Sequence, residues 1–106
     1  MTGVGFFTEM NIADFDNGSI KASLVEHVDY DKAAVIAYLQ SFKHRASCAR
    51  NAIDCVTGKV ISSYFLCYDD GEYCWCDFLI YHIQHYKIRL PQGLIEKANA
   101  SVNRPE

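Results

Sequence analysis

The sequence predicts an α+β fold, in which helices pack on an antiparallel β-sheet made of a three-stranded meander that N-terminal strands can extend. The main observation is the stretch from Lys59 to Leu94, where an Asp-Gly turn joins two aromatic-rich runs and a helical pattern follows. A second observation is a helical apolar repeat after Asp31. The chain has 106 residues and 50% of them are hydrophobic, so we expect a single domain over residues 1–106.

Two N-terminal segments have the composition of strands. Gly3 to Phe7 can start one strand, and Ile20 to Val28 can form a second after the turn cluster Asp16 to Ser19. We expect these two segments to pair with each other.

The clearest helix begins after Asp29 or Asp31, either of which can cap it, and runs to about Lys43. Its apolar positions recur at helical spacing and are Val35, Leu39 and Phe42. The basic residues His44 and Arg45 follow directly, which suits the negative C-terminal end of a helix.

Three strands are expected next, over Ser47 to Val56, Lys59 to Asp69 and Glu72 to Cys76. Two-residue turns, Thr57-Gly58 and Asp70-Gly71, connect them in this prediction. Tight turns of this kind fix the register of both hairpins, because the residues that flank each turn must face each other.

Counting from these turns places Cys48 opposite Cys67, and Cys67 opposite Cys74. Since side chains alternate between faces, one face of the sheet collects Cys48, Ile61, Phe65, Cys67, Cys74 and Cys76. The other face collects Ile53, Cys55, Val60, Tyr64, Leu66, Tyr68, Tyr73 and Trp75. We expect helices to cover one face and Trp75 and Leu66 to lie in a buried patch, with the tyrosine-rich face either half-covered or a contact surface.

A further helix is expected after the last strand, with Asp77 as its cap. Its apolar residues at helical spacing are Leu79, Ile83, Tyr86 and Leu90. A continued strand from Tyr86 to Leu90 is the alternative, because this run also alternates. Pro91 can open a last helix, Gln92 to Ala98, since its missing N–H costs nothing in the first turn.

The charge distribution bears on the class of partner. The net charge is −3, and the chain up to Asp31 carries six acidic residues against Lys21 alone. No basic stripe is available for phosphates, so we expect no direct nucleic-acid binding and favour a basic protein surface as partner. The N-terminus has no secretion-signal pattern, and no stretch approaches the ~18 apolar residues that span a bilayer. These features predict a cytoplasmic protein that does not enter membranes, and they leave its oligomeric state open.

The cysteines offer the most tempting chemistry. Without a secretion signal, five cysteines are expected to be reduced. Zinc could be held by the four that share a predicted sheet face, Cys48, Cys67, Cys74 and Cys76. Structural zinc sites, however, usually take close pairs such as C-x-x-C from turns, so buried thiols that act as small hydrophobes are favoured. We therefore expect no metal and no other cofactor.

Two histidines, His82 and His85, lie three apart on the helix predicted after Asp77 and could form a metal or acid–base pair. The glutamate of H-E-x-x-H is missing, so histidines on the surface or in contact with a partner are favoured. The chain also has no G-x-S-x-G elbow, phosphate loop or dinucleotide fingerprint. We therefore expect a protein without enzymatic activity.

A set of residues follows the Asp-Gly turn in a distinctive order: Asp70-Gly71-Glu72-Tyr73, Trp75, Asp77, Leu79-Ile80-Tyr81-His82, Tyr86, Leu90-Pro91 and Leu94-Ile95. This ending, over roughly the last forty residues, resembles that of small bacterial immunity proteins, the antitoxins of polymorphic and contact-dependent growth-inhibition toxins. There a hairpin with a D-G-x-Y/W-x-W element leads into a helix and an L-P-x-x-h-I segment. Cys76 departs from the pattern, because a proline is frequent at its position.

The resemblance implies a bacterial protein that binds one cognate toxin domain tightly and blocks it, and many such toxins are nucleases with basic clefts. Our candidates for the contact surface lie at the hairpin turn and are acidic or aromatic: Tyr68, Asp69, Asp70, Glu72 and Tyr73. Asp14 and Asp16 form a second acidic candidate. The sequence is equally consistent with ordinary, solvated turn residues at these hairpin positions.

Two other functions remain open. The first is a small zinc-binding or thiol-based domain that uses the four cysteines of one sheet face. The second is a phage-encoded inhibitor of a host defence complex, which is also an acidic binding protein and has the same features.

Overall fold

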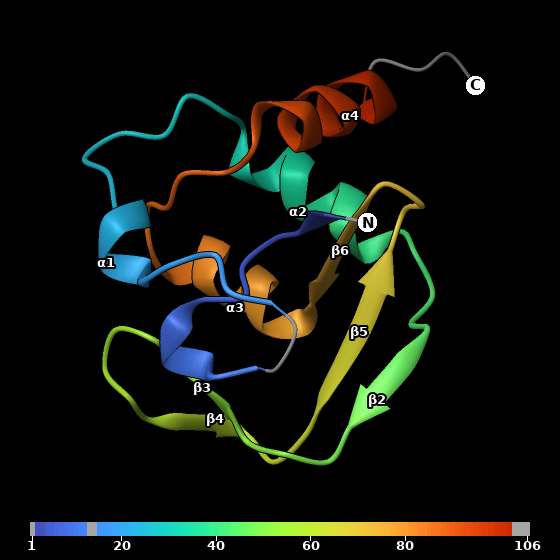
Figure 1. Cartoon of the computed structure of the whole chain (residues 1–106). Helices are drawn as coiled ribbons and strands as arrows, with labels where there is room; N and C mark the ends of the chain where they lie inside the picture. Colours follow the sequence, from blue (N-terminus) through green and yellow to red (C-terminus); the bar gives the residue numbers. More distant parts are fainter. Residues whose placement is uncertain (1, 13–14, 103–106) are drawn as a thin grey trace.

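Along the described part of the chain, one short strand is followed by three helical segments, then by five strands and finally by two helices (Figure 1). The computed structural model describes residues 2–12 and 15–102. Its strands are β1 (Thr2–Gly3), β2 (Ala46–Cys48), β3 (Ala52–Ile53), β4 (Val60–Ser62), β5 (Phe65–Asp69) and β6 (Tyr73–Cys76). Its helices are the 3-10 turn η1 (Thr8–Met10), α1 (Ile20–Ser23), α2 (Lys32–Gln40), α3 (Asp77–His85) and α4 (Gln92–Val102).

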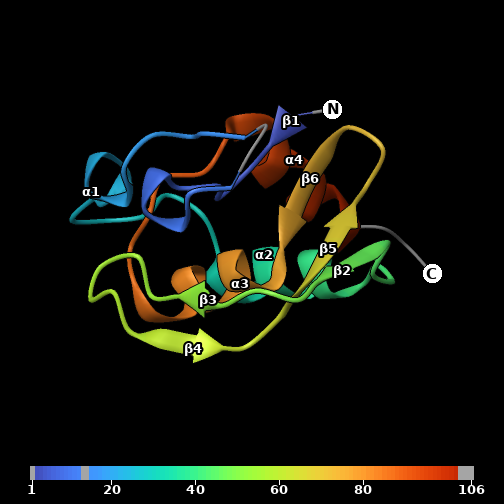
Figure 2. The ribbon, with the colours of Figure 1, turned by 60° about the horizontal axis from the view of Figure 1, so that its bottom comes forward.

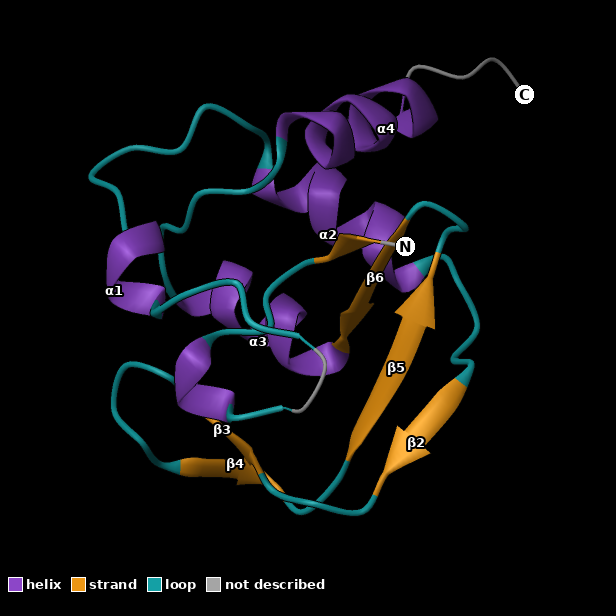
Figure 3. Cartoon of the chain, viewed as in Figure 1, coloured by secondary structure: helices purple, strands orange, loops and turns teal. Residues whose placement is uncertain are grey.

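The main sheet has the strand order β1-β6-β5-β2, and β3 and β4 form a separate two-stranded sheet (Figure 3). β2, β5 and β6 are antiparallel neighbours, whereas β1 runs parallel to β6 through Thr2 and Gly3. The predicted α+β class is confirmed, and the main sheet is mixed rather than purely antiparallel. The predicted meander survives as β2, β5 and β6, with the β3–β4 pair inserted between its first two strands.

The register of the second hairpin differs from the prediction. Cys67 faces Cys76 instead of Cys74, because the turn lies one residue further along, at Gly71 and Glu72. Asp70 N–H donates to the carbonyl of Tyr73 at 3.1 Å and closes this turn, in which Gly71 takes a φ of 93° that favours glycine. The displacement of two residues leaves the face assignment of each side chain unchanged, since faces alternate with a period of two.

The predicted first hairpin is divided between the two sheets. Its outer part pairs as β2 with β5, where Cys48 faces Phe65 rather than Cys67. Its inner part pairs as β3 with β4 around a wider turn, in which Asp54 N–H donates to the carbonyl of Lys59 and Gly58 N–H donates back to the carbonyl of Asp54. The two-residue turn at Thr57-Gly58 is therefore wrong, and the long strands predicted from it are shorter.

α2 begins where the sequence predicts. The carboxylate of Asp31 accepts hydrogen bonds from the N–H groups of Ala33 and Ala34 and caps the helix. The helix ends at Gln40 rather than near Lys43, because the Ser41 hydroxyl donates to the carbonyl of Tyr38 in the last turn.

Aromatic rings fill the space between α2 and the main sheet. Trp75 of β6 is fully buried and packs against Tyr38 and Phe42, with ring centroids 6.5 and 5.7 Å away. The predicted burial of Trp75 is confirmed, whereas Leu66 on the same face is only half-buried. Tyr38 of α2 therefore lies over the tyrosine-rich face of the sheet, at Trp75.

The N-terminal strand pair of the prediction is wrong. Only Thr2 and Gly3 form a strand, and Ile20–Ser23 is the short helix α1. The side chain of Asn17 takes the place of a neighbouring strand, since it accepts from Phe6 N–H at 2.8 Å and donates to the carbonyl of Gly3 at 3.0 Å.

The segment after α3 is extended and forms one isolated bridge, between Leu24 and Ile88. Val25 N–H donates to the carbonyl of Lys87, and Arg89 N–H donates to that of Ser23. The extended alternative for Tyr86 to Leu90 is thus the better one, although only Ile88 forms a β-bridge. The helix predicted after Asp77 is shorter than its apolar repeat and ends at His85.

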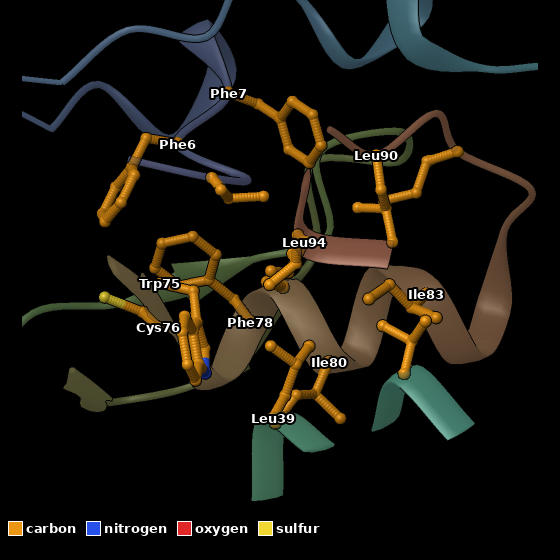
Figure 4. Packing of buried hydrophobic residues seen from close by; sticks show 14 of the residues in the cluster. Phe6, Phe7, Leu39, Trp75, Cys76, Phe78, Ile80, Ile83, Leu90 and Leu94 are labelled. Atoms are coloured by element: carbon orange, nitrogen blue, oxygen red, sulfur yellow. The ribbon is translucent and has the colours of Figure 1, made fainter. Parts of the chain in front are cut away.

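One apolar cluster joins residues from both ends of the chain, and α3 lies at its centre. Phe78, Leu79 and Ile83 of α3 are buried, as is Leu94 of α4. Figure 4 shows Ile80 of α3 pointing toward α2.

Figures 1 and 2 place α1 on the side of the molecule that carries β3 and β4, while α4 lies near the β5–β6 turn. No helix within the described ranges is long and apolar enough to cross a bilayer.

Candidate functional site

The candidate contact surface lies at the turn between β5 and β6, and we call residues 68–73 the hairpin tip. Asp70 is its centre. One carboxylate oxygen of Asp70 accepts from the N–H groups of Glu72 and Tyr73 at 2.8 and 2.7 Å. The other oxygen accepts from the Tyr38 hydroxyl of α2 at 2.7 Å and lies 3.4 Å from the Lys97 ammonium of α4. Only 2% of the Asp70 side chain is exposed, so this residue is an internal anchor and not a solvated turn residue.

Asp69 and Glu72 flank this anchor on the surface. Glu72 is 61% exposed and forms an ion pair of 2.9 Å with Lys97. Asp69 is 18% exposed and forms a longer pair of 3.5 Å with the well-exposed Arg45. The acidic charge of the hairpin tip is therefore partly compensated by two basic side chains that the sequence pattern did not reveal.

The pKa values at the hairpin tip reflect this arrangement. Burial alone would raise the pKa of Asp70, but hydrogen bonds from Tyr73 N–H, Tyr38 and Glu72 N–H, together with the Lys97 charge, outweigh burial and lower it. Burial and the hydrogen bond to Asp70 raise the pKa of Tyr38. The hydrogen bond to Glu72 raises the pKa of Lys97. Asp70 is thus an anion and Lys97 a cation over the whole neutral range.

The two tyrosines of the hairpin tip are half-buried. Tyr68 lies on Trp75, with ring centroids 6.4 Å apart and an interplanar angle of 14°. The Tyr73 hydroxyl lies directly against Gly93 of α4, where a Cβ atom would collide with it, and Lys97 lies 5.6 Å from the Tyr73 ring. Both rings support the tip from beneath and expose only part of their surface.

The second acidic candidate is separate from the hairpin tip. Asp14 lies outside the described residues. Asp16 is exposed and holds the N-terminal loop together, since its carboxylate accepts from the Thr8 hydroxyl at 2.7 Å and from Gly18 N–H at 2.8 Å. The hydrogen bond from Thr8 lowers the pKa of Asp16. Two other exposed acidic residues, Glu26 and Asp29, lie in the loop between α1 and α2.

His82 does not lie on the surface as the sequence predicts. It is fully buried in α3, where its Nε2 accepts from Cys55 N–H at 2.9 Å and its Nδ1 donates to the carbonyl of Phe78 at 2.6 Å. Both nitrogens are used by a neutral ring, and burial lowers the pKa of His82 accordingly. His85 is exposed and packs on Tyr81, with ring centroids 4.3 Å apart, so the two histidines do not act as a pair.

A buried carboxylate, Asp54, lies close to His82 at the β3–β4 turn. One of its oxygens accepts from the hydroxyls of Tyr81 and Tyr86 at 2.7 and 2.6 Å. The other accepts from the N–H groups of Val56 and Thr57 at 2.8 and 3.0 Å. Burial would raise the pKa of Asp54, but these hydrogen bonds outweigh burial and lower it well below its ordinary value. The hydrogen bond to Asp54 raises the pKa of Tyr86 to about 12.

The cysteines do not gather into a zinc site. Cys67 and Cys76 lie close together, with their sulfur atoms 3.0 Å apart. Cys48 faces Phe65 and Cys74 faces Asp69 in the register that the structure adopts. Among residues 2–12 and 15–102 no three His, Cys, Asp or Glu side chains form a group that could hold a metal ion, so the four-cysteine alternative lacks its geometry.

Comparison of the chain with protein-family models, with curated protein sequences and with solved structures finds no match.

Proposed function

We propose that the protein is a non-enzymatic inhibitor of the immunity-protein class, which binds a basic toxin domain in the bacterial cytoplasm through the acidic hairpin tip. The observation that carries this proposal is the anchoring of Asp70 by α2 and α4. This anchor holds Asp69 and Glu72 at the surface in one fixed arrangement. A surface that is ordered before binding loses less entropy on association than a mobile loop does.

The two ion pairs of the tip are compatible with this role. Lys97 and Arg45 pair with Glu72 and Asp69 at positions that remain accessible to solvent. Exposed pairs of this kind contribute little to stability, so a basic side chain of a partner can replace Lys97 or Arg45 at small cost. Carboxylates in such a position can occupy the place where a nuclease binds phosphate groups.

The exposed acidic residues elsewhere fit the same role through long-range electrostatics. Asp16, Glu26 and Asp29 are exposed, and the salt bridges found within the described part of the chain use none of them. Negative charge in the first third of the chain therefore favours approach to a basic partner. Tyr68 and Tyr73 add partly exposed aromatic area beside the acidic groups.

The test is a binding measurement with the product of the adjacent upstream gene, because an immunity gene normally follows its toxin. A double variant, Asp69→Lys with Glu72→Lys, reverses charge at the surface and leaves the Asp70 anchor in place. We expect the association rate to fall by about tenfold or more at low salt, and the effect to shrink as salt is added.

The matched control is Glu26→Lys with Asp29→Lys, which changes the net charge by the same amount on a different loop. An equal loss in both double variants would show that only net charge matters and would remove the hairpin tip from the interface. A partner that belongs to a host defence complex, instead of a toxin, would favour the phage-encoded inhibitor.

A further inference from the structure

Two cysteines meet across the β5–β6 ladder. Cys67 of β5 and Cys76 of β6 are directly opposed, and their sulfur atoms are 3.0 Å apart. This distance is shorter than ordinary contact between sulfur atoms, and the thiol of one residue can donate a hydrogen bond to the other. A disulfide between them needs a further approach of only about 1 Å to reach a bond length near 2.05 Å.

The backbone around this pair also suits a disulfide. Asp70 and Tyr73 form a hydrogen-bonded pair at the turn, so alternation along the ladder makes Cys67 and Cys76 a pair without mutual backbone hydrogen bonds. Consistent with this, the carbonyl of Cys67 accepts from Arg45 N–H on the other side of the strand, at 2.7 Å. In such pairs the Cα atoms are about 4.5 Å apart, which lies within the range that disulfides span.

The two thiols differ in their access to solvent. Cys67 is half-buried and can be reached from outside, whereas Cys76 is fully buried at the start of α3. Burial and the neighbouring Cys67 raise the pKa of Cys76, so this residue stays a protonated thiol. The pair thus has one sulfur that can meet a reagent and one that can only react with its neighbour.

None of the other cysteines, all of which lie in the described ranges, has this arrangement. Cys48 faces Phe65 and Cys74 faces Asp69 across their ladders. Cys55 is buried in a separate turn, and burial raises its pKa to about 12. The close sulfur pair is therefore confined to Cys67 and Cys76.

We propose that Cys67 and Cys76 form a dithiol site that low-molecular-weight disulfides such as oxidised glutathione convert into an intramolecular disulfide. The Cys67 thiolate, having given its proton to solvent, attacks one sulfur of oxidised glutathione and releases one glutathione thiolate. Cys76 then loses its proton to solvent, attacks Cys67 and releases the second glutathione thiolate. Two protein thiols are oxidised and one glutathione disulfide is reduced to two glutathione molecules, which take up the two protons.

The disulfide would join β5 to the last residue of β6, directly before α3. It would close the loop between Cys67 and Cys76 and thereby restrict the unfolded chain. We therefore expect the oxidised protein to melt roughly 5 to 15 °C above the reduced protein. The second step requires a buried thiol to lose its proton, so we expect this step to limit the rate.

The experiment incubates the folded, reduced full-length protein with oxidised glutathione and then blocks free thiols before digestion. We expect a single disulfide, Cys67 with Cys76, and three remaining thiols. Cys74→Ser is the matched control, because it removes a half-buried thiol from the same strand, and it should form the disulfide as the unchanged protein does. Cys76→Ser should instead retain one glutathione on Cys67.

Three results would overturn the proposal: five free thiols in the unchanged protein after prolonged oxidation, a disulfide with a different partner, or a glutathione adduct on Cys67 that Cys76 never resolves. The mapping on the unchanged protein does not depend on whether a serine variant folds. This test is also independent of the toxin-binding role, since it needs no partner protein.

Discussion

Two turns of this molecule are organised by a buried aspartate in nearly the same way, and they differ in what lies beyond the aspartate. Asp54 at the β3–β4 turn and Asp70 at the β5–β6 turn each use one oxygen for two backbone N–H groups, two and three residues ahead. The other oxygen of each accepts from tyrosine hydroxyls, which belong to Tyr38 of α2 at Asp70, and to Tyr81 of α3 and the following Tyr86 at Asp54. Asp54 accepts from two tyrosine hydroxyls, and none of the salt bridges among the described residues involves it. Asp70 accepts from one tyrosine hydroxyl and pairs with Lys97.

This difference separates a purely structural turn from a turn that is connected to surface charge. The Asp54 cluster is closed, since all of its hydrogen-bond partners belong to the adjacent turn and to the α3 region. The Asp70 cluster continues through Lys97 to the exposed Glu72. Charges at the molecular surface can therefore act on the second turn through the ion pairs of Lys97.

The largest expected effect comes from Asp54→Ala. This change removes a buried carboxylate that accepts four hydrogen bonds, from two tyrosine hydroxyls and two backbone N–H groups. Because hydrogen bonds to a charged group are among the stronger ones, we expect a loss of roughly 3 to 5 kcal/mol in the free energy of unfolding. Urea denaturation followed by circular dichroism measures this loss. The control is Asp54→Asn, which keeps one acceptor oxygen and should lose less free energy of unfolding. Equal losses in the two variants would mean that the hydrogen bonds to this side chain do not contribute to stability.

Asp70→Ala should destabilise the protein by roughly 2 to 4 kcal/mol, because it leaves Tyr38 and two backbone N–H groups without their acceptor. Part of this loss is recovered because the freed Lys97 can turn to solvent. The same denaturation experiment compares it with Asp54→Ala. A loss below about 0.5 kcal/mol would show that Asp70 is an ordinary solvated turn residue after all.

Acid should weaken both turns. The pKa values of Asp54 and Asp70 are lowered in the folded protein, so their contribution is complete above the ordinary pKa of about 4. This contribution to stability is lost as the pH falls below that value, because the unfolded chain then binds more protons at these carboxylates than the folded chain does. We expect the melting temperature to fall less between pH 7 and pH 3 in Asp54→Asn than in the unchanged protein. Equal falls would contradict the lowered pKa of Asp54.

The smallest effect is expected for Lys97→Met, which removes the cation but keeps most of the apolar stem. The melting temperature should change by less than about 3 °C, because the Lys97 side chain is 32% exposed and Asp70 keeps its three hydrogen-bond donors without it. High salt should bring the unchanged protein and the variant closer together. A Lys97→Met variant that also binds a basic partner faster would sharpen the contrast between the two turns, since Glu72 would then be unpaired.

The candidate site was predictable only in part. The acidic residues of the hairpin tip are visible in the sequence because they lie around an Asp-Gly turn. Tyr38 and Lys97, which hold Asp70, lie 32 and 27 residues away from it along the chain. Nothing in their local pattern marks them as its partners. The sequence therefore gives the chemistry of the tip, and the packing of α2 and α4 determines which of its carboxylates is buried.

By itself the sequence determined features that depend on neighbouring residues, such as the α2 cap at Asp31 and the alternation that buries Trp75. Tertiary structure decided the register of both hairpins, the parallel pairing of β1 and the burial of His82. The physical reason lies in the range of the hydrogen bonds. A helix cap or a strand face follows from contacts within a few residues, whereas the buried carboxylate at the β3–β4 turn also accepts from Tyr81 and Tyr86, which lie 27 and 32 residues away along the chain.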